Sequence, residues 1–211
     1  MKLTVTTFQT LDGVMQAPGG PQEDPSNGFE HGGWLVPHAD PDMGTFIDET
    51  FRSAEAFLLG RRTYEIFAAH WPKVGGEDPV ANPLNALPKY VASRTLRQED
   101  LEWAGSSLLG DDVPAALAEL KERPGGELQV HGSAGLIQTL LREGLIDELR
   151  LLTFPVVLGT GKRLFEGGAV PAGVRLTESR TTSTGTVIAV YAFEGRPSYG
   201  SFALEDSADA A

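Results

Sequence analysis

Two short segments of the chain combine glycine with groups that bind phosphate. Gly60-Arg61-Arg62-Thr63 follows an apolar run and opens a stretch with helical spacing; the glycine admits a ligand to the backbone and two guanidinium groups can pair with phosphate. Gly132-Ser133-Ala134-Gly135 also stands between a predicted strand and a predicted helix, where backbone N–H groups can hold a pyrophosphate. Each segment has a plainer interpretation, a tight turn with solvated arginines and an ordinary strand–helix turn, respectively.

A third segment, Ser93-Arg94-Thr95, follows another predicted strand and adds hydroxyls and a guanidinium; by itself it is a polar turn. Ligands of open α/β sheets collect at the carboxyl ends of strands, so the three segments are expected to converge. The formal net charge is −12, which makes a local group of arginines stand out. Together they predict an anion site suited to a dinucleotide with an extra phosphate, NADP rather than NAD.

Four further residues are candidates for chemistry on a substrate. Asp12, beside a glycine after the first predicted strand, could orient a heterocycle or relay a proton, or could simply form an Asp-Gly turn. Trp34 could stack on a flat substrate, or pin its long loop to the body of the protein. Asp48 could face a pocket from a helix or lie on a solvated helix face. Lys162 could bind a substrate phosphate or carboxylate, or belong to the acidic protein's ordinary surface.

The composition excludes several classes of function. The chain has 211 residues, 41% of them hydrophobic and 22% charged, as in ordinary globular proteins. No cysteine is present and the four histidines lack metal-ligand spacing, so we expect no disulfide, no thiolate nucleophile and no metal site. An acidic chain is expected to avoid nucleic acid and anionic membranes, and the N-terminus looks like a strand rather than a signal peptide. A cytoplasmic location is expected.

Alternation of strand and helix patterns predicts a mainly parallel sheet with an antiparallel edge hairpin, covered by helices. The expected strands are 3–8, 56–59, 89–92, 128–130, 148–158, 174–180 and 187–193, and the expected helices are 45–53, 64–70, 113–120 and 136–141. Pro155 lies inside one expected strand and predicts an edge or a bulge there. Residues 16–42 are expected to form a long loop. One domain, 1–195, and an acidic flexible tail, 196–211, are predicted.

Several motifs resemble one protein superfamily. Leu59-Gly60-Arg61-Arg62-Thr63-Tyr64-Glu65 resembles the cofactor loop of dihydrofolate reductases. Val130 to Leu136, Gly144 to Arg150 and Pro155 to Phe165 are similar to the C-terminal reductase domain of the bacterial riboflavin-biosynthesis deaminase-reductase, as are Thr10-Leu11-Asp12-Gly13 and Gly32-Gly33-Trp34. The matches run in order from residue 2 to about residue 193.

The resemblance implies a dihydrofolate reductase-like three-layer α/β fold and NADPH lying across the strand ends. It implies that residues 60–63 hold the cofactor's phosphates, that Ser93 and Arg94 lie near its adenosine, and that Gly132, Ser133, Ala134 and Gly135 cover the pyrophosphate. A homodimer is also expected. The expected activity is NADPH-dependent hydride transfer to a small heterocyclic substrate, pyrimidine-ribose or pterin-like, similar to that of 5-amino-6-(5-phosphoribosylamino)uracil reductase. Asp12 and Asp48 are the candidate catalytic residues, and Trp34 and Lys162 are the candidates for substrate binding.

Two departures keep an alternative open. The zinc-binding deaminase domain of the riboflavin enzyme has no counterpart in a chain without cysteine. The acidic side chain that assists protonation in dihydrofolate reductases, early in their first helix, has no gap-free match among Asp40, Asp42, Asp48 and Glu49. A non-catalytic module that keeps the fold and a nucleotide pocket is therefore the alternative function.

Overall fold

β1 (Lys2–Thr10) lies in the interior of the sheet, and both of its faces are covered. Leu3 and Val5 are fully buried on one face, and Thr4 and Thr6 are buried on the other. A strand buried on both sides is typical of a sheet that carries helices on both faces. The computed structural model describes residues 1–110, 112–165 and 170–202.

The described residues form an eight-stranded mixed sheet in the order β4-β3-β2-β5-β1-β6-β8-β7. Its other strands are β2 (Ala54–Gly60), β3 (Lys89–Ala92), β4 (Ser106–Leu108), β5 (Glu127–His131), β6 (Glu148–Phe154), β7 (Gly173–Thr181) and β8 (Val187–Gly195). The first six strands of this order pair in parallel, whereas β8 runs antiparallel to β6 and β7 antiparallel to β8. The predicted parallel sheet with an antiparallel edge hairpin is confirmed.

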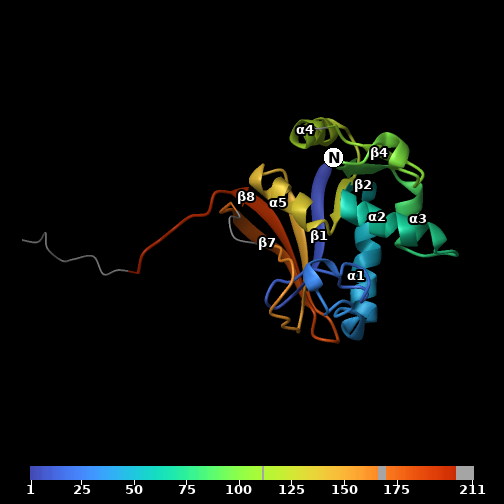
Figure 1. Cartoon of the computed structure of the whole chain (residues 1–211). Helices are drawn as coiled ribbons and strands as arrows, with labels where there is room; N and C mark the ends of the chain where they lie inside the picture. The colour runs from blue at the N-terminus through green and yellow to red at the C-terminus, as the bar shows by residue number, and fades with distance from the viewer. Residues whose placement is uncertain (111, 166–169, 203–211) are drawn as a thin grey trace, which may run out of the picture.

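Helices cover both faces of this sheet, which makes three layers (Figure 1). α4 (Val113–Glu122) and α5 (Ala134–Arg142) pack Leu117 and Ile137 against the face that carries Leu3 and Val5. On the other face lie α1 (Pro41–Arg52), α2 (Arg61–His70) and α3 (Ala81–Ala86), whose buried side chains pack on Phe57 and Leu59 of β2 and on Phe154 of β6.

Aspartates begin two of these helices. The side chain of Asp40 accepts a hydrogen bond from the Met43 N–H at the start of α1, and Asp112 accepts one from the Ala115 N–H at the start of α4. A capping carboxylate satisfies a backbone donor that has no partner within the helix. α2 and α5 have no such side-chain cap, a difference that matters at the cavity below.

Three expectations about elements need correction. The predicted strand 148–158 ends at Phe154, and Pro155 lies outside it; β6 is an interior strand flanked by β1 and β8, where a residue without an N–H cannot extend the ladder. Helices α1 and α2 begin at Pro41 and Arg61, three or more residues before the periodicity suggested. The short elements α3 and β4 were not predicted.

The long segment 16–42 contains two 3-10 turns, Ser26–Gly28 and Val36–His38, and packs closely on the body. Phe29, Trp34 and Leu35 are buried in a cluster with Phe154. Gly32 allows this packing, because a β-carbon there would lie only 2.5 Å from the Gly20 carbonyl oxygen. The loop is thereby fixed in a position from which Asp24 reaches the side chains of Arg62 and Lys162.

Within the described part of the chain, no helix combines the length and apolar character needed to cross a bilayer. Of the predicted tail 196–211, residues 203–211 lie outside the described residues.

Candidate active site at the strand ends

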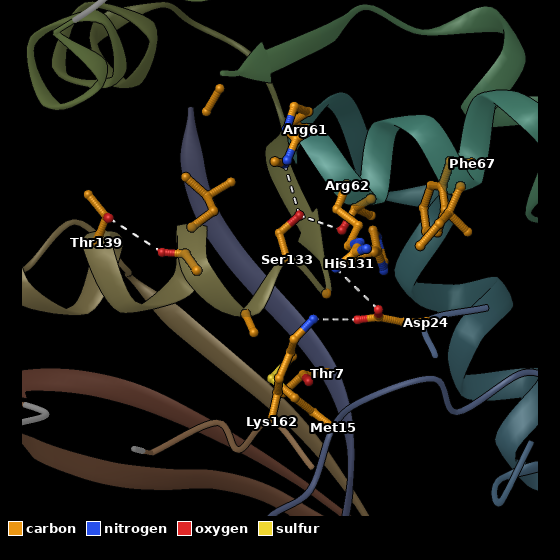
Figure 2. A pocket seen from close by; sticks show the side chains of 18 of the residues that line it. Thr7, Met15, Asp24, Arg61, Arg62, Phe67, His131, Ser133, Thr139 and Lys162 are labelled. Carbon is orange, nitrogen blue, oxygen red and sulfur yellow. Dashed lines mark hydrogen bonds and ion pairs between the residues drawn. The ribbon is translucent and has the colours of Figure 1, made fainter. Parts of the chain in front are cut away.

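A cavity of about 660 Å³ opens where β1, β2, β3 and β5 end. Its lining includes all ten residues predicted to bind the cofactor, 60–63, 93–94 and 132–135, together with Lys162. The sheet therefore brings together three loops that lie up to 75 residues apart in the sequence, as the convergence argument expected. Figure 2 shows the side chains that surround this cavity.

The first wall of the cavity is the start of α2. Gly60 is the N-cap and offers no side chain, so the first N–H groups of the helix remain available as donors beside Arg61 and Arg62. Arg61 pairs only loosely with Glu65, at 3.4 Å on the exposed surface. A helix N-terminus with two guanidinium groups attracts an anion such as a phosphate group.

The second wall is the start of α5, where the chain takes an unusual conformation. Gly132 has φ of 75°, and Ser133, a residue with a side chain, also has a positive φ of 68°. Such left-handed geometry is costly for an L-residue other than glycine and is held by surrounding contacts. A β-carbon at Gly132 or Gly135 would meet no atom within 4 Å, so space is open beside this turn.

The side chain of Ser133 joins the two walls. Its hydroxyl accepts a hydrogen bond from the Gly60 N–H at 2.9 Å and donates to Thr63 Oγ1 at 2.6 Å. This double role explains why the serine does not cap its own helix. A β-carbon at Gly60 would lie 2.9 Å from Ser133 Oγ and 3.1 Å from Ser133 Cβ, so the two loops can approach this closely only with glycine at position 60.

Further basic residues make the cavity locally positive. Ser93 stabilises the turn after β3, because its hydroxyl accepts hydrogen bonds from the N–H groups of Thr95 and Leu96, and Arg94 lines the cavity next to it. Arg142 of α5 also lines it, a residue that the sequence did not single out. The lining contains five basic residues, Arg61, Arg62, Arg94, Arg142 and Lys162, against two acidic ones, Glu23 and Asp24.

Opposite the arginines, Lys162 meets the long loop. Its Nζ lies 2.5 Å from Asp24 Oδ2 and 2.9 Å from Ser26 Oγ. Asp24 in turn lies 3.3 Å from an Nη of Arg62, so it stands between the two cations, as Figure 2 shows. Burial alone would raise the pKa of the Asp24 carboxyl, but hydrogen bonds from Lys162 and Ser26 hold it below its usual value.

Glu23, next to Asp24, has a different environment. It is half-buried in the cavity wall, and one carboxyl oxygen accepts a hydrogen bond from the Gly19 N–H at 2.6 Å. Burial raises the pKa of this carboxyl, and the nearby negative charge of Asp24 acts in the same direction. No motif identified Glu23 or Asp24 beforehand, because both belong to a segment whose sequence predicts only a loop.

His131 contributes a neutral ring at the base of the cavity. It stacks on Phe51 with 4.4 Å between ring centroids, and its Nε2 lies 3.0 Å from Gln129 Oε1. Burial lowers the pKa of His131 to about 3, so the ring stays uncharged at neutral pH. The histidine thus has a structural role.

Three predicted site residues lie outside the cavity. Trp34 is buried, packs edge-on against Phe154 at 5.4 Å and donates its indole N–H to the Gln16 carbonyl, which is the loop-pinning role rather than substrate stacking. Asp48 forms an ion pair with Arg52 of the same helix and does not line the cavity, a position that does not favour the predicted catalytic role. Phe46, Thr50 and Phe51 occupy the buried face of this helix, and Asp48 lies partly exposed beside them.

Asp12 is the third residue that the structure places elsewhere. Its carboxylate accepts hydrogen bonds from the N–H groups of Leu158 at 3.2 Å and Gly159 at 2.8 Å, and it pairs with Arg163 at 3.2 Å. The hydroxyl of Thr10 donates a further bond at 2.6 Å, and these donors hold the pKa of Asp12 well below its usual range. Asp12 therefore anchors the loop that carries Lys162 instead of facing the ligand space.

The mixed eight-stranded sheet with helices on both faces, open to a basic cavity at the ends of its parallel strands, has a dihydrofolate reductase-like fold. Within this fold class, the chain belongs to the RibD C-terminal domain family, whose model matches residues 1–189. It is 31% identical over 191 residues to YyaP of Bacillus subtilis (strain 168), itself uncharacterized; the match spans 88% of this chain and 92% of YyaP.

Solved structures agree on the fold. A protein from Shewanella sp. PV-4 assigned to riboflavin biosynthesis superposes with a TM-score of 0.66 at 19% identity, over 92% of this chain and 99% of that one. Dihydrofolate reductase from Enterococcus faecalis, solved with NADP(H), gives 0.57 at 13% identity over 91% and 96% of the two chains. The Thermotoga maritima diaminohydroxyphosphoribosylaminopyrimidine deaminase/5-amino-6-(5-phosphoribosylamino)uracil reductase gives 0.59 at 14% identity, over 91% of this chain and 56% of that one.

Proposed function

We propose that the protein is an NADPH-dependent reductase that transfers hydride to a small heterocyclic substrate, of a pyrimidine-ribose or pterin-like kind. Family membership supports a reductase of this type, and the Enterococcus relative was solved with NADP(H). The observation that carries the proposal is the pair of uncapped helix N-termini, joined through Ser133, that face one basic cavity.

The residues present fit a nicotinamide dinucleotide. A pyrophosphate needs closely spaced N–H donors and room beside the backbone; α2 and α5 begin without side-chain caps, and the space beside Gly132 and Gly135 is open. Residues 60–63 and 132–135 would hold this part of the cofactor. Arg94 and Ser93, at the end of β3, would receive the adenosine end and its extra phosphate.

When bound, the dihydronicotinamide supplies hydride to an electrophilic carbon. The chain's own part is to position the two reactants and to keep water away from the reacting atoms. The side of the cavity formed by Lys162, Asp24 and Glu23 offers charged and hydrogen-bonding groups to the substrate. Asp24 stays ionised between Lys162 and Arg62, so it can fix a ligand N–H group without changing its charge.

Calorimetric titration with NADPH, NADH and NADP⁺ tests the cofactor assignment. We expect NADPH to bind more tightly than NADH, and the double change Arg61→Ala and Arg62→Ala to weaken NADPH binding by about 10- to 100-fold per lost phosphate contact. Arg175→Ala is the matched control, because Arg175 pairs with Glu194 on the far edge hairpin. Absence of binding by all three nucleotides would leave the proposal without support.

A further inference from the structure

The cavity contains two neighbouring carboxyl groups whose surroundings differ sharply. Asp24 lies between two cations, 2.5 Å from Lys162 Nζ and 3.3 Å from the Arg62 guanidinium. Glu23 receives instead a neutral main-chain donor, the Gly19 N–H at 2.6 Å, and lies half-buried in the same cavity wall. Two adjacent residues of one loop thus differ: Asp24 is paired with cations, whereas Glu23 has no ion pair among the described contacts.

Two carboxyl groups with opposed environments commonly take different chemical roles. Burial, and to a smaller extent the negative charge of Asp24, raise the pKa of Glu23 against the hydrogen bonds from Gly19 and Gly20. Hydrogen bonds from Lys162 and Ser26 hold the pKa of Asp24 below its usual value. The other charged groups that face this cavity are Arg61 and Arg62 of α2, Arg94 after β3, Arg142 of α5 and Lys162, while His131 is neutral. Asp24 pairs with two of these cations, Arg62 and Lys162, and partly neutralises their charge.

We propose that Glu23, held in the cavity wall by the Gly19 N–H, is the proton donor of the reaction, and that Asp24 is the fixed anion beside it. This inference rests on the proposed function. The substrate's C=N or C=O carbon gains a hydride from the dihydronicotinamide, which is oxidised, and the π electron pair moves to the substrate heteroatom. That heteroatom takes the proton of the Glu23 carboxyl, and the resulting carboxylate regains a proton from water.

Glu23→Gln is the informative variant, because the amide oxygen of glutamine can still accept the Gly19 N–H while the acidic proton is lost. Glu30→Gln is the matched control: Glu30 lies in the same long segment, is exposed and does not line the cavity. NADPH consumption is measured with two probes, dihydrofolate and 5-amino-6-(5-phosphoribosylamino)uracil. We expect Glu23→Gln to lower kcat by about 10²- to 10⁴-fold and to leave the Kd for NADPH unchanged within about twofold.

The pH profile gives a second readout of the same role. Since a proton donor must be protonated, kcat of the unaltered protein should fall as pH rises through the pKa of Glu23. Glu23→Gln should remove this limb of the profile, and Glu30→Gln should keep it.

Carboxyl ¹³C NMR of the cofactor-free protein tests the inference without turnover. The Glu23 signal, assigned by its loss in Glu23→Gln, should titrate above the usual glutamate pKa of about 4.3. Asp24→Asn should shift that titration downward, because it removes one negative charge and leaves Arg62 and Lys162 unneutralised.

Each outcome discriminates. Reduction of a probe at an unchanged rate by Glu23→Gln overturns the role of Glu23 and leaves the proposed function intact. A Glu23 carboxyl that titrates at or below the usual value overturns the role independently of any substrate. If the unaltered protein binds NADPH but reduces neither probe, the proposed substrate class and the proton-donor role fall together.

Discussion

The contact between Gly60 and Ser133 makes a quantitative prediction about how the two cofactor loops depend on each other. In Gly60→Ala the added β-carbon would lie 2.9 Å from Ser133 Oγ and 3.1 Å from Ser133 Cβ, while the φ of −74° at Gly60 suits alanine. Overpacking of this kind costs about 1–3 kcal/mol, and the lower chain entropy of alanine in the unfolded state returns about 0.4–1 kcal/mol. We expect a net loss of about 1–2 kcal/mol.

Ser133→Gly is the second single variant of a double-mutant cycle with Gly60→Ala. It removes two hydrogen bonds, from the Gly60 N–H and to Thr63, worth about 1 kcal/mol each. Glycine also adopts the positive φ of position 133 without strain, which reduces the loss in the free energy of unfolding by about 1 kcal/mol. In the double variant the atoms that collide with the β-carbon added at position 60 are gone, so the loss should be no larger than for Ser133→Gly alone. The two changes should therefore couple by about 1–2 kcal/mol.

Urea unfolding of the unaltered protein, the two single variants and the double variant measures this coupling, provided that the slope of the unfolding free energy against urea concentration is the same for all four. Gly44→Ala is the control: Gly44 lies within α1, its β-carbon would meet no atom within 4 Å, and alanine there should stabilise by about 0.5–1 kcal/mol. Losses that add within about 0.5 kcal/mol would refute the argument, since additivity is the behaviour of sites that do not touch.

Three other features give shorter predictions. Burial lowers the pKa of Lys89 to about 8, below its value in the unfolded chain. Above pH 8 the unfolded state therefore binds more protons than the folded state, and the free energy of unfolding should rise by up to about 3 kcal/mol from pH 8 to pH 10.5. Lys89→Met should abolish this rise in urea titrations. Asp12→Asn should lower the free energy of unfolding by about 1–2 kcal/mol at pH 7, because asparagine accepts weaker hydrogen bonds from the N–H groups of Leu158 and Gly159. The lowered pKa of Asp12 shows that its contacts favour the ionised carboxylate, so the difference between the two proteins should shrink as pH falls below the usual aspartate pKa. A difference that does not change with pH would contradict this prediction. The edge strand β7 leaves about half of the Val174 and Leu176 side chains exposed, and we expect homodimerisation through this edge. Sedimentation should show a dimer that the substitution Leu176→Glu dissociates. A monomeric unaltered protein would exclude this dimer.

Local sequence signals predicted most of the fold. Apolar runs identified most of the seven predicted strands, because burial on one or both faces leaves that imprint directly in the residue order. The exposed strand β7 was predicted with β8 as a hairpin around the turn at residues 183–185. Gly60 at the end of β2 and Gly132 after β5 identified the turns that meet at the cavity. The strand β4, with three residues, and the helix α3, with six, were too short to show a period.

Long-range contacts explain what the sequence could not reveal about the site. Asp12 is predicted equally well as a turn former or a ligand group, and only its bond to Gly159, 147 positions away, decides that it anchors a loop. Glu23 and Asp24 look like ordinary loop carboxylates until Trp34 and Phe29 fix their segment on β6. Arg142 belongs to the last turn of α5, where a basic residue is favoured by the helix dipole, so its sequence position suggests no ligand.

The opposition between global and local charge leads to one further expectation. The net charge of −12 repels a nucleotide phosphate at long range, whereas the arginines of the cavity attract it at short range. Salt screens charges beyond a Debye length of about 8–10 Å more than it screens contacts within a cavity. In the unaltered protein, added salt should therefore weaken NADPH binding only modestly. In the double variant Arg61→Ala and Arg62→Ala, the acidic surface and the carboxylates of Glu23 and Asp24 outweigh the attraction of the remaining cavity cations, Arg94, Arg142 and Lys162, so added salt should strengthen the residual binding. Calorimetry at two salt concentrations measures both signs, and a parallel decrease in the two proteins would show that Arg61 and Arg62 are not the groups that overcome the acidic surface.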